Sequence, residues 1–524
     1  MQKLFKLSLI ATVMLSTSCA IQPNKKQEIT EPSGPKNIIL MVSDGIGFNG
    51  WLAADYYQGL AGQQTYQVTR PDGTKPLVFG LAHSALNLVD EDGNTLAKGA
   101  DISTAAGAVE QGYDPLTRWQ RFENAMLNDF TGSGSYTSYT DSAAAGTALM
   151  SGRKTAVGRV NMDWSNSEQF DTIAQIAMKK GLSAGTVTSV MVSHATPAAA
   201  VAHNVSRNNY AEIFNEMHDS GLSVIMGAGH PIYDASGQLK PQDKQTYKYV
   251  GGEQTYNVLR ANEKGSATAY IESKSEFEAL AQGQPLPERV VGIVRSGSTL
   301  QASRAGLNSA NTPSGMAFNE GVPSLATMSM GALNVLNQDQ DGFFAMIEGG
   351  AVDWMGHANN MPRFIEEQVD FNQAVDAVIK WVETNSSWDE TLLIITSDHE
   401  CGGIWGEGTW TNGQGGAVAM DRSKASLETA RFNPAEDQFN AFLAVQNRGK
   451  GNIAGYQWAS RNHTNELVPL WVLGKGADRF KEFSRTDPKA GQLWGEHYNW
   501  NGNYVDNTSV FQVMEAALLR STAR

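Results

Sequence analysis

Asp353 and His357 are the first candidates for metal chemistry, because they stand four residues apart in the segment 348–357. On a helix, residues i and i+4 lie on one face, so both side chains could bind one metal ion. The same spacing occurs by chance on many solvated helices. Asp398 and His399 are adjacent, and both can reach one site only where a strand ends and the chain turns.

Other polar residues also follow apolar runs. Asp44 comes directly after residues 37–42 and precedes Gly45, which allows close approach of the backbone. An aspartate that only shapes a turn explains this segment equally well. His194 follows the apolar run 186–192, and His463 precedes the apolar run 469–473. Both are therefore candidate site residues.

Ser142 is the candidate nucleophile. It follows Asp141 and precedes a run of small residues, which predicts the first turn of a tightly packed helix. Free N–H groups and the positive end of the helix dipole there favour a bound phosphate. A serine that merely caps the helix is the alternative. A Ser-His-Asp hydrolase lacks support, because no G-x-S-x-G elbow is present.

Arg207 is the candidate phosphate-binding cation, because arginine can bind two phosphate oxygens at once. Thr196 followed by Pro197 predicts a helix start, and Arg207 comes eleven residues after Thr196. On a straight helix that separation is ~16 Å, so the chain must bend near Asn204 for both residues to reach one site. An ordinary solvated arginine is the alternative.

The elements that must position these residues indicate an α/β fold. Continuous apolar runs alternate with helical segments, at residues 37–42, 186–192, 343–347, 391–396 and 469–473. Such runs are typical of a mostly parallel sheet covered by helices on both faces. Ligands bind beyond the carboxyl ends of such strands, and four of these five runs end in a carboxylate or an imidazole. We expect a three-layer sandwich with a large central sheet.

Two stretches interrupt this alternation of strands and helices. Residues 233–323 and 404–455 contain few strong apolar runs, and loops of that length are uncommon inside one domain. We expect them to be insertions that form a cap over one edge or over the site. Residues 37–524 are otherwise expected to form a single domain.

Composition and charge exclude several classes of protein. The chain has 524 residues with 54 acidic and 40 basic side chains, a formal net charge of −14. A nucleic-acid binder would need a basic face, so no nucleic-acid partner is expected. Outside the N-terminus no apolar run approaches ~18 residues, so no transmembrane span is expected. An anionic substrate would need positive charge gathered locally at the site.

Residues 1–20 have the pattern of a secretory signal, with Lys3 and Lys6 before the apolar stretch 7–15. Cleavage after Ala20 would give a soluble exported protein, periplasmic or extracellular. An imperfect lipobox ending at Cys19 would instead give a lipid-anchored one, and both alternatives stay open. Residues 21–36 are polar and are expected to form a tether.

Taken together, these segments resemble the alkaline phosphatase family, from residue 37 to about residue 476 and in the family's order. The matching motifs are Ser-Asp44-Gly, Thr-Asp141-Ser142-Ala-Ala, His194-Ala-Thr196-Pro-Ala, Arg207, Glu348-Gly-Gly-Ala-Val-Asp353-Trp354-Met-Gly-His357, Ser-Asp398-His399-Glu and Asn462-His463-Thr. Any one of them is weak evidence, but seven in this order are highly specific.

The resemblance implies two zinc ions and one magnesium ion. The implied ligands are Asp353, His357 and His463 for the first zinc, Asp44, Asp398 and His399 for the second zinc, and Asp44, Thr196 and Glu348 for magnesium. Some members of the family have aspartate where this chain has His194, which leaves the identity of the third metal open. Some have lysine or histidine at Trp354, so this chain lacks a cation there. Cys401 is expected to be a buried structural residue, with a thiolate zinc ligand as the alternative.

The resemblance also implies an activity: hydrolysis of phosphate monoesters through a phosphoserine on Ser142, with Arg207 holding the phosphoryl oxygens. One alternative is a phosphodiesterase of the same superfamily. The other is a secreted protein that binds metal or phosphate without catalysis. Family members are commonly homodimers, and the long insertions leave the oligomeric state of this chain open.

Overall fold

The computed structural model describes residues 34–96, 102–110, 112–115, 140–261, 268–284, 286–306, 308–406, 443–458 and 461–521. The expected signal segment and most of the expected tether lie outside these residues. None of the helices in the described ranges is both long enough and apolar enough to cross a membrane.

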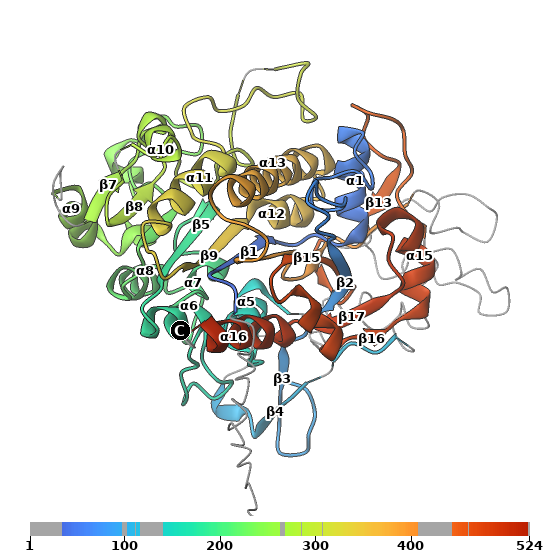
Figure 1. The fold of residues 1–524 in the computed structure, drawn as a ribbon. Coiled ribbons are helices and arrows are strands. Elements are labelled where there is room, and N and C mark those ends of the chain that lie inside the picture. Colours follow the sequence, from blue (N-terminus) through green and yellow to red (C-terminus); the bar gives the residue numbers. More distant parts are fainter. Residues whose placement is uncertain are drawn as a thin grey trace, which may run out of the picture.

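An eleven-stranded sheet forms the centre of the fold (Figure 1). From one edge to the other its strands are β16 (Arg485–Thr486), β17 (Asn503–Asp506), β2 (Leu77–Ala82), β15 (Val468–Gly474), β10 (Thr391–Thr396), β1 (Asn37–Ser43), β9 (Phe343–Gly349), β5 (Ser183–Met191), β6 (Val224–Ala228), β8 (Arg289–Ile293) and β7 (Thr268–Ile271). The neighbours from β10 to β7 pair in parallel, whereas β15 is antiparallel to both β10 and β2. The predicted three-layer fold with a mostly parallel sheet is confirmed.

Helices cover both faces of the sheet, because the central strands are apolar on both sides. In β1, Ile39 and Met41 pack into one core, and the alternating Ile38, Leu40 and Val42 pack into the other. The first core receives α1 (Phe48–Gln58), α10 (Lys274–Ala281), α11 (Leu325–Leu336), α13 (Met361–Asn385) and α15 (Pro488–Tyr498). The second receives α5 (Ser142–Ser151), α6 (Ile173–Lys179), α7 (Ala195–Ala198), α8 (Tyr210–Asp219), α9 (Glu253–Ala261) and α16 (Thr508–Ser521). Figure 1 shows α13 and α16 on opposite sides of the sheet.

The expected insertion at 233–323 does not lie wholly outside the sheet. Its segments β8 and β7 extend the sheet by two parallel strands beyond β6, and α10 packs on α11. The stretch therefore forms one edge of the domain, and only the remaining loops are excursions from it. Of the expected insertion at 404–455, residues 407–442 lie outside the described residues. Strands β12 (Ile404–Gly406) and β13 (Tyr456–Trp458) pair at its base.

Three shorter elements complete the frame around the strand ends. The ribbon of β11 (Glu400–Cys401) and β14 (His463–Thr464) lies just beyond β10 and before β15. Helix α12 (Ala351–His357) begins directly after β9 and packs against α13. Strands β3 (Leu86–Val89) and β4 (Gly107–Glu110) form an antiparallel pair that lies at the bottom of the view in Figure 1, below α16.

Candidate active site

The carboxyl ends of four neighbouring strands meet at one edge of the sheet. Strands β10, β1, β9 and β5 are adjacent and parallel, and just beyond or within their last residues lie Asp398, Asp44, Glu348 and His194. Strand β15 runs the opposite way, so the segment that precedes it, with His463, reaches the same edge. One edge therefore gathers side chains that are far apart in the sequence.

Ser142 lies beside the first of these clusters. Its Oγ is 3.1 Å from His399 Nε2 and 3.5 Å from Asp44 Oδ1. His399 Nε2 in turn lies 3.3 Å from Asp44 Oδ1 and 3.4 Å from Asp398 Oδ2. All four side chains are buried. The hydroxyl thus faces the same point as two carboxylates and an imidazole.

Helix α5 holds Ser142 in this position. Asp141 caps the helix by accepting a hydrogen bond of 3.0 Å from the amide of Ala144. The small residues that follow allow α5 to approach α7 closely: a Cβ added at Gly146 would lie 2.9 Å from Ala199 Cβ. The serine therefore stands in the first turn of a rigidly packed helix, where backbone N–H groups favour an anion.

Asp353, His357 and His463 form a second cluster. Asp353 and His357 come from α12, where their carboxylate and imidazole lie 3.4 Å apart, and His463 Nε2 lies 3.3 Å from Asp353 Oδ1. The two Nε2 atoms face each other at 3.1 Å. His463 Nδ1 donates to the carbonyl of Thr140 and His357 Nδ1 to that of Arg461. These outer contacts leave both Nε2 lone pairs directed at one point, as in metal sites.

A third group contains only oxygen atoms. Glu348 accepts a hydrogen bond from Thr188 through Oε2, but no described residue donates to its Oε1. The hydroxyl of Thr196 lies next to Glu348, yet it makes no hydrogen bond of good geometry with any residue in the described ranges. Burial raises the pKa of Glu348 to about 7, so the surroundings of this carboxylate oppose its negative charge.

The carboxylates of the site crowd one another. Burial, and then the charges of Asp398, Asp353 and Glu348, raise the pKa of Asp44 well above its usual value. Burial would also raise the pKa of Asp353, but the neighbouring His357 and His463 hold that pKa well below its usual range. Such an arrangement lacks positive charge at the points where the carboxylates converge.

Bound cations would offset the negative charge of these carboxylates and would bind their unpartnered oxygen atoms. All three groups contain buried side-chain atoms that have no hydrogen-bond partner within the described part of the chain: Asp44 Oδ2, Asp398 Oδ2, Asp353 Oδ1, Glu348 Oε1 and Thr196 Oγ1. A buried polar atom without a partner costs on the order of 1–3 kcal/mol. Imidazole with carboxylate suits zinc, and an all-oxygen set suits magnesium, so the residues fit these metals.

Arg207 reaches the site because the chain bends, as the spacing requires. Helix α7 ends at Ala198, α8 begins at Tyr210, and Asn204 in between pairs with Val160. The guanidinium of Arg207 donates through Nη1 to Asp141 Oδ2 at 2.9 Å. One carboxylate thus both caps the serine helix and orients the arginine.

His194 and Trp354 lie together beside these groups. Their rings pack edge to face with centroids 5.6 Å apart, and the other side of His194 stacks on Tyr210. Burial and then the charge of Arg207 lower the pKa of His194 to about 3, so this imidazole is neutral. An uncharged, apolar wall therefore borders the arginine.

Two residues near the site are not among the active-site residues that the sequence predicts, although a thiolate ligand is the alternative for Cys401. His83 is buried just beyond β2, with its ring centroid 6.4 Å from that of His399. Cys401 is buried beside Asp353, His357 and His463. A strand-end position was the available signal for His83, but a single histidine after a short apolar run is weak evidence.

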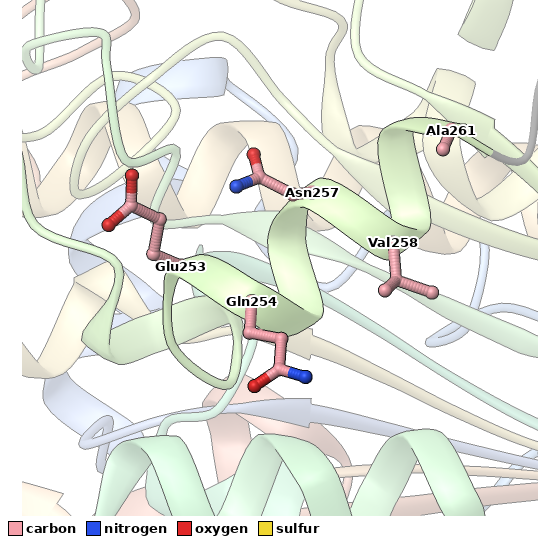
Figure 2. Close-up of a pocket in the computed structure, with 5 residues that line it drawn as sticks. All are labelled: Glu253, Gln254, Asn257, Val258 and Ala261. Atoms are coloured by element: carbon pink, nitrogen blue, oxygen red, sulfur yellow. The ribbon is translucent and has the colours of Figure 1, made fainter.

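A shallow hollow on α9 is separate from these groups. Figure 2 shows its five lining side chains pointing in different directions from one helix: Glu253, Gln254, Asn257, Val258 and Ala261. They include no histidine or cysteine and none of the residues predicted to act in chemistry. The hollow therefore adds nothing to the site.

Comparisons with known proteins identify one family. The family model described as alkaline phosphatase matches residues 116–519. Alkaline phosphatase 4 of Bacillus subtilis is 27% identical over 407 residues, which cover 70% of this chain and 78% of that protein. Alkaline phosphatase of Escherichia coli is 28% identical over 319 residues, which cover 57% of this chain and 65% of that protein.

Solved structures show the same fold. Alkaline phosphatase from the Antarctic bacterium TAB5 superposes with a TM-score of 0.54 at 18% identity, over 93% of this chain and 99% of that one. A histidine-to-aspartate variant of the TAB5 enzyme has magnesium bound in a site called M3. The matched length, the order of the motifs and the clustered side chains lead to one conclusion: the chain belongs to the alkaline phosphatase family, a family of hydrolases that act on phosphate esters.

Proposed function

We propose that this protein hydrolyses phosphate monoesters to an alcohol and inorganic phosphate, through a phosphoserine on Ser142. The single observation that carries the proposal is the position of Ser142 Oγ, 3.1 Å from His399 Nε2 and in the first turn of α5. A metal-binding or phosphate-binding protein without catalysis has no need of a hydroxyl at this point.

Each residue has a role in this reaction. Ser142 Oγ attacks phosphorus and forms an O–P bond as the bond to the alcohol breaks. The donors of Arg207 that Asp141 does not use would bind equatorial phosphoryl oxygens, where negative charge is greatest. Water then attacks the phosphoserine, which releases phosphate and returns the hydroxyl.

We propose two zinc ions and one magnesium ion in the groups that fit them. Asp353, His357 and His463 would hold the first zinc, Asp44, Asp398 and His399 the second, and Asp44, Thr196 and Glu348 the magnesium. When bound, these metals supply a lowered pKa for the attacking group and positive charge for the departing oxygen. Their charge would also offset the acidic excess of the chain at the one place where a phosphate must bind.

A preference for monoesters follows from the charge around the phosphoryl position. A monoester is a dianion with three free oxygens. Arg207 would supply N–H donors to these oxygens, and the carboxylates of the oxygen-only group would favour the dianion through the cation that they hold. The neutral His194 and the half-buried Trp354 add no further cation. A diester has one charge fewer and a second ester group to accommodate.

The test uses matched substrates and matched variants. The metal-loaded protein should release p-nitrophenol from p-nitrophenyl phosphate far faster than from its methyl diester. Phosphate label should appear on Ser142 in acid-quenched protein. Ser142→Ala should lower kcat by ~10³-fold or more, whereas Ser151→Ala, at the other end of α5, should leave it unchanged. Normal turnover without label on Ser142 would refute the phosphoserine, and a faster diester reaction would favour the phosphodiesterase.

We also propose that the protein is exported, because residues 1–20 have the pattern of a secretory signal. The mass of the mature protein tests this. A chain that begins at Ile21 indicates a soluble form, a lipid-modified Cys19 indicates an anchored form, and an intact Met1 would contradict export.

A further inference from the structure

Cys401 lies directly opposite His463 in the ribbon of β11 and β14. Residues opposite each other in an antiparallel pair project to the same face. His463 directs its Nε2 toward Asp353, so the thiol of Cys401 projects toward the same cluster. The amide of Cys401 donates to the carbonyl of Gly45 at 3.1 Å and fixes this strand against the loop after β1.

The sulfur atom lies within the group of metal-ligating atoms. One such atom from each of Asp353, His357, Cys401 and His463 lies within 4.8 Å of all the others. Oδ1 of Asp353, whose side chain is 7% exposed, has no hydrogen-bond partner among the residues that the structure describes. The cluster therefore contains an unpartnered buried carboxylate oxygen as well as a buried thiol.

Gly356 makes this position of the thiol possible. A Cβ added at Gly356 would lie 3.0 Å from Cys401 Sγ and 3.1 Å from its carbonyl oxygen. Helix α12 carries both Asp353 and His357, so the glycine allows the sulfur to sit against the helix that supplies two ligands. The thiol is thus held between α12 and β14.

We infer that Cys401 Sγ is a fourth protein donor to the zinc held by Asp353, His357 and His463. This inference rests on the proposed function, which places zinc there. Thiolate is among the preferred ligands of zinc. On binding, the thiol loses its proton to solvent and forms a bond between sulfur and zinc. Zinc sites in proteins can accept five ligands, so a fourth protein donor would still leave a position for a phosphoryl oxygen.

X-ray absorption at the zinc edge tests the inference on the full-length zinc-loaded protein. The expected spectrum contains sulfur scattering at ~2.3 Å, in addition to nitrogen and oxygen at ~2.0 Å. The Cys19→Ser variant should retain the sulfur signal, because Cys19 lies in the N-terminal signal. Cys401→Ser should lose it and release one zinc to a chelator ~10–100-fold more readily. Cobalt in place of zinc should give a sulfur charge-transfer absorption that only Cys401→Ser removes.

The outcomes separate this inference from the proposed function. A zinc-loaded, active protein with only nitrogen and oxygen scattering overturns the inference and leaves the phosphatase proposal standing. Sulfur scattering that persists in Cys401→Ser also overturns it. Sulfur scattering that depends on Cys401, in a protein that does not hydrolyse monoesters, supports the inference and overturns the proposed function. The wild-type spectrum alone is decisive if the variant does not fold.

Discussion

Two adjacent glutamates on α13 are expected to respond oppositely when their charge is removed. Glu366 accepts from Arg304 Nη2 at 2.9 Å and from the amide of Ser314 at 2.7 Å, inside the domain. Glu367 is equally buried, but its Oε1 has no hydrogen-bond partner in the part of the chain that the structure describes. Burial, and then the nearby Asp370, raise the pKa of Glu367 from 4.5 to about 8, while Arg304 opposes the rise.

The sign of the effect follows from proton binding. Between pH 4.5 and about 8 the unfolded chain loses the Glu367 proton, whereas the folded chain keeps it. The free energy of unfolding therefore falls as pH rises through this interval and levels off above it. At ~1.4 kcal/mol for each tenfold change in acidity, the ceiling is about 5 kcal/mol. Glu367→Gln removes this loss, so it should stabilise the protein by at least about 2 kcal/mol at alkaline pH.

Urea unfolding followed by tryptophan fluorescence at about pH 5, 7 and 9 measures the effect. The difference in stability between Glu367→Gln and wild type should grow with pH, and effects of metal loss cancel because both proteins share them. Glu366→Gln is the matched control. It should destabilise by about 3–5 kcal/mol, because Arg304 is left buried and unpaired. If the difference in unfolding free energy between Glu367→Gln and wild type stays constant from pH 5 to 9, the reasoning is refuted.

Three further predictions concern the site itself. Arg207→Lys should raise KM for a monoester about tenfold with a smaller change in kcat, because lysine cannot contact Asp141 and two phosphoryl oxygens together; steady-state kinetics with an unchanged KM would contradict this. Thr196→Val removes the unpartnered hydroxyl and should lower magnesium affinity, by calorimetry, while zinc content stays the same; equal affinity would exclude Thr196 as a ligand. Gly356→Ala places a methyl group 3.0 Å from Cys401 Sγ and should reduce zinc content by metal analysis; full zinc content would show that β11 can move aside.

The central strands could be predicted from the sequence because their apolar runs end sharply. The run 391–396 coincides with β10, and the run 343–347 gives all but the last two residues of β9. Both strands are buried on both faces, so nearly every residue is apolar. The edge strand β7 could not be found in this way, because only Ile271 of its four residues is buried. A strand with so little buried surface leaves no continuous apolar run.

Some residues of the site could be placed from the sequence, and others could not. Residues after parallel strands, such as Asp44 and Asp398, could be placed at one edge from strand direction alone. His463 comes before a strand, and it reaches that edge only because β15 is antiparallel to β10. Strand direction depends on sheet order, which is a long-range property. The pairing of Cys401 with His463 likewise depends on the register of two short strands far apart in the sequence.

Because β10, β1 and β9 are adjacent strands, the sheet itself sets the spacing between the residues that follow them. Neighbouring strands in a sheet lie ~4.8 Å apart, whatever side chains they carry. Asp398, Asp44 and Glu348 therefore lie at the ends of strands whose spacing is set by backbone hydrogen bonds. That spacing is close to the ~4 Å that separates ions in two-metal catalysis. Loops can lengthen around this edge of the sheet without changing the spacing between the strands. A neighbouring residue such as His194 or Trp354 could therefore be replaced without a change in this strand spacing.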